Sequence, residues 1–135
     1  MLNTVFNIIG AIAGLATAGA FVFAIKSYLR FRKTEQLRIV ESIYKDIRDL
    51  ERERTQVSQR GDKPEELNDW HSRYFNTLEW LSYLTNRDQV DYKMVSEFFS
   101  QLIIDSYGFM QASYKGNPKE FPEFKKLYGK VNTQN

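Results

Sequence analysis

The sequence predicts an all-α protein: one N-terminal transmembrane helix, an amphipathic stalk helix that continues it, and a small cytoplasmic bundle of about three helices. Three observations lead to this prediction. Residues 5–25 form an uncharged apolar run, apolar residues recur at helical spacing through the remainder of the chain, and no run has strand periodicity. We therefore expect a transmembrane helix in residues 1–25, a stalk in residues 26–60, and a helical domain that packs on the stalk in residues 61–135.

Composition narrows the class of protein further. Aromatic residues make up 15% of the 135 residues, against only three prolines, which favours a packed helical domain over a disordered chain. The absence of cysteine excludes disulfides, zinc–thiolate sites and cysteine nucleophiles. The formal net charge of +2 is too small to indicate a nucleic-acid partner.

The apolar run over residues 5–25 is long enough to cross a bilayer as a helix. At about 1.5 Å of rise per residue it spans roughly 31 Å, against a hydrocarbon core of about 30 Å. The alternatives are a cleavable signal peptide and a buried core helix. The preceding residues, M-L-N-T, carry no Lys or Arg, and the run exceeds the roughly 7–15 residues of a signal core. These features favour the transmembrane helix.

Basic residues follow the apolar run and predict its orientation. Lys26, Arg30, Arg32 and Lys33 all lie on the C-terminal side, and no basic side chain precedes the run. The positive-inside bias then places the N-terminus outside and the C-terminal domain in the cytoplasm, as in a single-pass protein of the cytoplasmic membrane. The basic flank is expected to lie among the lipid head groups, either as an ordinary stop-transfer flank or as a specific lipid contact.

Small residues form a stripe inside the apolar run. Gly10, Gly14 and Ala18 recur at every fourth position, which places them on one face of a helix. Small side chains let two helix backbones approach closely in lipid. The stripe therefore predicts a helix–helix contact with a second copy or with another subunit.

The stalk carries an amphipathic pattern. Val40, Ile43, Ile47 and Leu50 recur at spacings of three and four and share one face. They also fit the a and d positions of a coiled coil, but for only about two heptads, and a coiled coil needs three or four. We therefore expect this face to pack against the later helices.

The last part of the chain carries the boundaries of further helices. Asp62 and Glu65 resemble a capping box at the start of a helix that runs to about Asn86. Asp91 is placed to cap the next helix, which turns back antiparallel because the connection is short. Pro122 marks the start of a short C-terminal helix, which we expect to lie across the two longer ones.

Polar residues in this domain form no catalytic, cofactor-binding or metal-binding set. His71 is the only histidine and no Glu-x-x-His motif accompanies it, so we expect a boundary residue. Asn76 and Glu79 share a helical face and form the candidate polar pair, in either a structural role or a binding role. Asp105 has the same ambiguity. The many aromatic residues, Phe98 among them, are expected mostly in the core, with a few at an interface.

Several short stretches of the second half of the chain form a recognisable set: F-N-T-L-E at residues 75–79, V-D at 90–91, Phe98 with Ile103, and F-P-E-F-K-K-L at residues 121–127. With these stretches the chain resembles a family of uncharacterised bacterial and archaeal proteins with one N-terminal span and a cytoplasmic helical domain. Tyr74 stands where the family usually has a second Phe. This is a domain of unknown function, so the resemblance implies an architecture and no activity, and it singles out residues 76 and 79 as a shared structural or binding pair.

We expect a non-enzymatic, membrane-anchored helical module that binds a protein partner or a second copy of itself. The alternative is an accessory subunit of a larger membrane complex, packed through the small-residue stripe. A less favoured hypothesis is an enzyme that uses Glu79, Asp105 and His71 in a cleft. Membrane lipid and protein are the expected partners, and neither a cofactor, a nucleic acid nor a small-molecule substrate is predicted.

Overall fold

The computed structural model describes residues 2–61, 63–114 and 120–134, with the side chains of residues 2–18, 57–58 and 60 excepted. This part of the chain is helical, without a strand, and confirms the all-α class. The helices are α1 (Leu2–Arg60), α2 (Pro64–Asn86), α3 (Tyr92–Ser113) and α4 (Pro122–Asn132).

The chain divides into two compact units. The N-terminal unit is Met1–Glu35, and the unit that we call the bundle is Gln36–Asn135. Helix α1 runs without a break through the expected boundary between residues 25 and 26, and the division falls further along it. The bundle therefore consists of the C-terminal part of α1 together with α2, α3 and α4.

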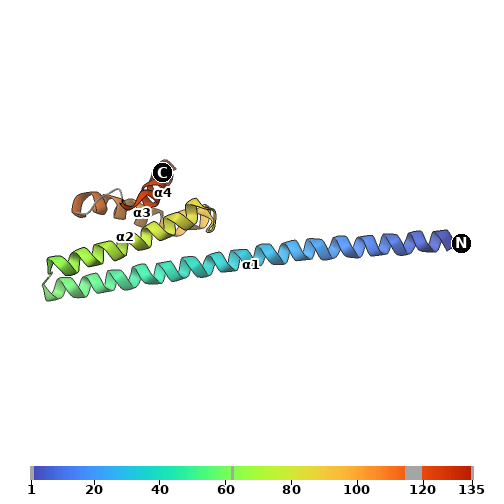
Figure 1. The fold of residues 1–135 in the computed structure, drawn as a ribbon, viewed down its shortest axis with the longest axis horizontal. Helices are drawn as coiled ribbons and strands as arrows, with labels where there is room; N and C mark the ends of the chain where they lie inside the picture. The colour runs from blue at the N-terminus through green and yellow to red at the C-terminus, as the bar shows by residue number, and fades with distance from the viewer. Residues whose placement is uncertain (1, 62, 115–119, 135) are drawn as a thin grey trace. The chain divides into compact units, whose positions relative to one another are not determined.

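Within the bundle, α1 and α2 run antiparallel, side by side (Figure 1). Gly61 makes the reversal possible because its φ of +85° lies in the left-handed region that disfavours residues with a Cβ. The predicted face of α1, formed by Val40, Ile43, Ile47 and Leu50, is buried in the core. The apolar pattern of the stalk therefore indicated correctly which side of α1 the later helices cover.

The helix starts follow local sequence rules, with one difference. Asp91 caps α3 as predicted, since its carboxylate accepts a hydrogen bond of 3.0 Å from the Lys93 amide. Helix α2 begins at Pro64 after Lys63, whose side chain makes no capping hydrogen bond. Asp62 of the predicted capping box lies outside the described residues.

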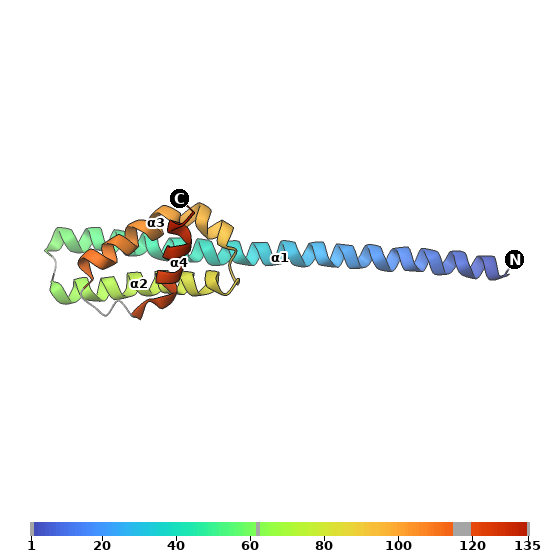
Figure 2. The ribbon, with the colours of Figure 1, turned by 90° about the horizontal axis from the view of Figure 1, so that it is seen from above.

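Helix α4 crosses α2 and α3, as predicted, and contacts both (Figure 2). Phe124, Leu127 and Val131 recur at spacings of three and four on α4 and are fully or almost fully buried. Because these side chains complete the core between α2 and α3, this short helix is an integral part of the bundle rather than an appendage.

The predicted transmembrane helix and the single-pass membrane localisation are corrected by the structure. Across the described residues, no helix has a stretch that is both apolar enough and long enough to cross a bilayer. In α1 the described side chains begin at Gly19, and Lys26 interrupts the apolar sequence soon afterwards, followed by Arg30. A charged side chain is costly to bury in hydrocarbon. The apolar stretch of α1 whose side chains are described, residues 19–25, is therefore too short to cross a bilayer.

The small-residue stripe lies in the N-terminal part of α1. The backbone of Gly10, Gly14 and Ala18 is helical, but their side chains lie outside the described residues. The helix–helix contact inferred from this stripe stays a prediction.

Candidate functional site

A groove opens between α1 and α3 on the surface of the bundle. It has a volume of about 450 Å³. We call it the α1–α3 groove, and its lining residues are Leu37, Val40, Glu41, Tyr44, Phe98 and Phe99. Apart from one carboxylate, the lining consists of large aliphatic and aromatic side chains, as is typical of sites that bind apolar groups.

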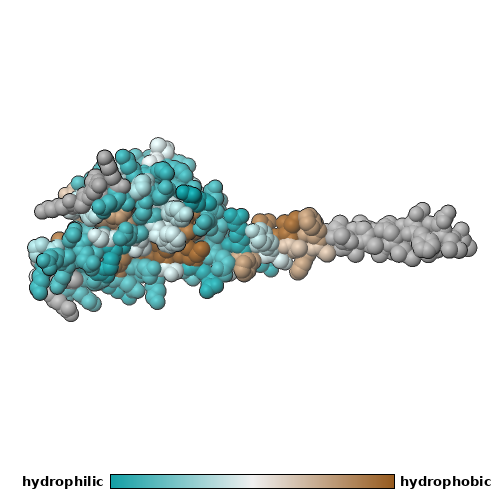
Figure 3. All heavy atoms as spheres, viewed as in Figure 1, coloured by the Kyte–Doolittle hydropathy of each residue, from teal (hydrophilic) through white to brown (hydrophobic). Residues whose placement is uncertain are grey.

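Large apolar side chains at this groove are exposed to solvent. Phe98 is 63% exposed, Tyr44 50% and Leu37 39%, whereas Phe99 is buried. On the face seen in Figure 3, apolar residues interrupt the mostly hydrophilic surface of the bundle. Exposed apolar side chains gathered around one hollow indicate a binding surface more strongly than scattered ones do.

The groove is held in shape by contacts between its walls. The ring of Tyr44 on α1 meets Phe99 on α3 edge to face, with 6.2 Å between the ring centroids. The guanidinium of Arg48 lies over the Tyr44 ring at 5.8 Å from its centroid. These contacts fix the orientation of Tyr44, so one wall of the groove is preorganised.

Sequence patterns identified only part of this groove. Val40 belongs to the predicted face of the stalk, and Leu37 and Tyr44 lie three residues before it and four after it on α1. Phe98 follows the helical period of α3 and was expected in the core, but it is exposed. The pattern cannot reveal this difference, because the side of α3 that faces outward depends on where α4 packs.

The two residues of the predicted Asn76–Glu79 pair differ in their contacts. The Glu79 carboxylate accepts hydrogen bonds from the Glu123 amide, at 3.0 Å, and from the Phe124 amide, at 2.7 Å. Helix α4 has no side-chain cap of its own at Phe121, so a residue of α2 caps it instead. Asn76 is exposed. The contacts of Glu79 with α4 are structural, and Glu79 also lines a shallow hollow together with Asn76. A binding role of the two residues stays a prediction.

A polar network beside Glu79 also joins α2 to α4. The Asn86 side-chain amide donates hydrogen bonds to the backbone oxygen of Glu123, at 3.1 Å, and to its carboxylate, at 2.8 Å. Lys130 donates to the Asn86 side-chain oxygen at 3.2 Å. The hydrogen bond from Asn86, followed by the one from Lys126, lowers the pKa of Glu123. Two stretches named in the family resemblance, residues 75–79 and 121–127, therefore meet in space.

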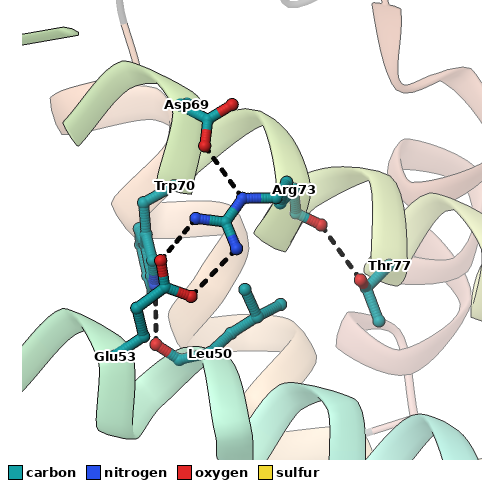
Figure 4. A network of polar contacts seen from close by, with 6 residues as sticks. All are labelled: Leu50, Glu53, Asp69, Trp70, Arg73 and Thr77. Atoms are coloured by element: carbon teal, nitrogen blue, oxygen red, sulfur yellow. Dashed lines mark hydrogen bonds and ion pairs between the residues drawn. The ribbon is translucent and has the colours of Figure 1, made fainter. Parts of the chain in front are cut away.

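A second polar network joins α1 to α2 (Figure 4). Arg73 makes a bidentate ion pair with Glu53, with N–O distances of 2.6 and 2.9 Å, and also bonds Asp69 at 3.0 Å. The hydrogen bond from Arg73 lowers the pKa of Glu53. Beside them the Trp70 indole donates to the Leu50 backbone oxygen at 2.6 Å. These contacts fix the position of α2 along α1.

His71 is buried among aromatic rings instead of lying at a boundary. It is 6% exposed, and its ring contacts Trp70, Phe75 and Phe109. Its Nε2 atom has no hydrogen-bond partner among the described residues. Burial lowers the pKa of His71, and the positive charge of Arg54 lowers it further.

The residues of the enzyme hypothesis make separate contacts. Asp105 is exposed, accepts a hydrogen bond of 2.8 Å from Gln101, and lines a hollow that neither His71 nor Glu79 lines. The Glu79 carboxylate accepts hydrogen bonds from α4, and His71 lies in the aromatic cluster. No group of His, Asp and Glu side chains within the described part of the chain is arranged to hold a metal ion.

The predicted lipid-flank residues lie on α1 in the N-terminal unit. Lys26, Arg30, Arg32 and Lys33 are all exposed. Large apolar residues between and before them, including Phe21 and Phe31, are exposed as well. This segment contrasts with the bundle, where most large apolar residues are buried.

Comparisons with family models, with curated proteins and with solved structures found no match to this chain.

Proposed function

We propose that this protein is a non-enzymatic helical interaction module whose α1–α3 groove binds an amphipathic helix of a partner protein. The observation that carries the proposal is the exposure of Phe98 and Tyr44 beside a preformed apolar hollow. A groove between two helices suits a helix that inserts apolar side chains at a spacing of three and four residues. The volume of about 450 Å³ can hold several large side chains.

The charge at the groove specifies the partner helix further. Among the described residues, Glu41 is the one charged residue that lines the groove, and it is exposed. A basic residue beside the apolar anchors of the partner would meet this carboxylate, whereas an acidic residue would be repelled. We therefore expect the partner segment to carry Lys or Arg next to its apolar face.

The absence of catalysis is part of the proposal. The side chains that could have served in acid–base chemistry have structural contacts instead: Glu79 caps α4, and His71 is buried in the aromatic cluster. Both contacts support a module whose activity is recognition.

Site-specific photocrosslinking in the source cells tests the proposed function. A photoreactive amino acid is placed at residue 98 or 37, and at residue 80 as the control, since Trp80 is 55% exposed but does not line the groove. We expect both groove positions to crosslink the same partner segment, which is an amphipathic helix with a basic residue, and residue 80 not to do so. Equal crosslinking from residue 80, or no common segment from the groove positions, would contradict the proposal.

A further inference from the structure

A second surface lies outside the bundle, on α1 between residues 21 and 33. Within this stretch, which we call the basic–aromatic segment, every residue is exposed. Its first five residues are apolar, its basic residues lie among further apolar ones from Lys26 onward, and it contains no acidic residue. The apolar residues are Phe21, Val22, Phe23, Ile25, Tyr28, Leu29 and Phe31. Figure 3 shows apolar residues at the surface of this unit.

Helical periodicity separates the two kinds of side chain. Lys26, Arg30 and Lys33 lie at i, i+4 and i+7, so they share one face of α1. Phe21, Ile25, Tyr28 and Leu29 lie on a different face. The separation is incomplete, because Arg32 falls between Phe21 and Ile25 and Phe23 falls next to Arg30. The segment therefore has a mainly basic face and a mainly apolar face, as in helices that lie in the surface of a bilayer, and the long side chain of Arg32 can extend its charged head from the apolar face towards the lipid phosphates.

We propose that the basic–aromatic segment binds an anionic lipid surface and lies along it. The apolar face would enter the boundary between head groups and acyl chains, and the basic face would meet the lipid phosphates. Exposed Phe and Tyr rings suit this interfacial depth. This binding would use a surface other than the α1–α3 groove, and it requires no helix to cross the membrane.

The charge of the segment favours an anionic lipid surface over other partners. It has several basic residues and no acidic residue, so it complements an anionic surface and is repelled by a second copy of itself in parallel register. A nucleic acid would also satisfy the charges, but it would leave most of the apolar face in water. The lipid surface satisfies both faces at once.

Vesicle co-sedimentation of the full-length chain tests the proposal. The vesicles contain either phosphatidylcholine alone or phosphatidylcholine with phosphatidylserine. We expect binding to the anionic vesicles only, and weaker binding as salt is raised. Each basic residue near the surface strengthens binding about fivefold, so replacing Lys26, Arg30 and Lys33 with Gln should weaken it about a hundredfold.

Matched variants distinguish the segment from net charge and from a nucleic-acid site. Replacing Lys45, Lys93 and Lys125 with Gln removes the same charge from exposed positions in the bundle, and it should change binding much less. The double substitution Phe21→Ser with Leu29→Ser should abolish vesicle binding with the basic residues intact. Equal binding to neutral vesicles, no binding to anionic ones, or an equal loss in the bundle control would overturn the proposal. So would tighter binding to single-stranded RNA that the Phe21 and Leu29 substitutions leave unchanged.

Discussion

Some single residues of the bundle stabilise a helix other than their own. Glu79 is the clearest example, because its carboxylate on α2 accepts hydrogen bonds from the first free amides of α4. Pro122 has no amide hydrogen to offer, and Phe121 gives no side-chain cap. The start of α4 thus depends on a residue more than forty positions earlier in the chain.

Replacing Glu79 with Ala should lower the free energy of unfolding by about 1–2 kcal/mol, because it removes the only side-chain cap described for α4 and leaves amides without partners. Urea denaturation measures the change. The control is Asn76→Ala on the same helix, where the side chain is exposed, and we expect a change within about 0.5 kcal/mol. Equal effects of the two substitutions would contradict the capping role.

His71 predicts a pH dependence of stability. Burial lowers its pKa in the folded state, so the unfolded chain binds more protons below the ordinary His pKa of about 6.5. The free energy of unfolding should therefore fall as pH is lowered from about 7 to 5, and a His71→Phe variant should lose this part of the dependence. Urea titrations at several pH values measure it. An unchanged pH dependence in the variant would show that His71 is not responsible.

At the scale of elements, local patterns predicted most of the helices. Pro64, Asp91 and Pro122 mark helix starts in the sequence, and the helices begin at or directly after them. These rules depend on neighbours in the chain, which the sequence shows. The cap on α4 and the exposure of Phe98 depend on how α4 crosses α2 and α3. Neither can therefore be predicted from residues that are neighbours in the sequence.

Helix α4 should be essential for the stability of the bundle. Phe124 is fully buried and lies against Phe75 and Tyr107. Phe124→Ala should lower the free energy of unfolding by about 3–5 kcal/mol, because it removes apolar burial and leaves a cavity. The neighbouring Lys125 is exposed, so Lys125→Ala is the control, with little change expected. Denaturant unfolding followed by circular dichroism compares the two, and a small loss for Phe124→Ala would show that α4 is a detachable element.

At the scale of the whole chain, two units carry two different surfaces. The bundle has a buried core and the α1–α3 groove, whereas the N-terminal unit exposes the basic–aromatic segment. The all-α class and the face of the stalk followed from periodicity alone. The predicted localisation did not hold, because the described residues of α1 include no apolar stretch long enough to cross a bilayer.

The most direct measurement is the dissociation constant of the crosslinked partner segment, made as a synthetic peptide, for the wild-type chain and two variants. Phe98→Ser removes the most exposed aromatic side chain of the groove, and truncating a central anchor of this kind commonly weakens binding at least about tenfold. Trp80→Ser removes an aromatic side chain of similar exposure outside the groove and should leave the constant unchanged. An unchanged constant for Phe98→Ser, or an equal loss for Trp80→Ser, would show that the partner does not bind in the α1–α3 groove.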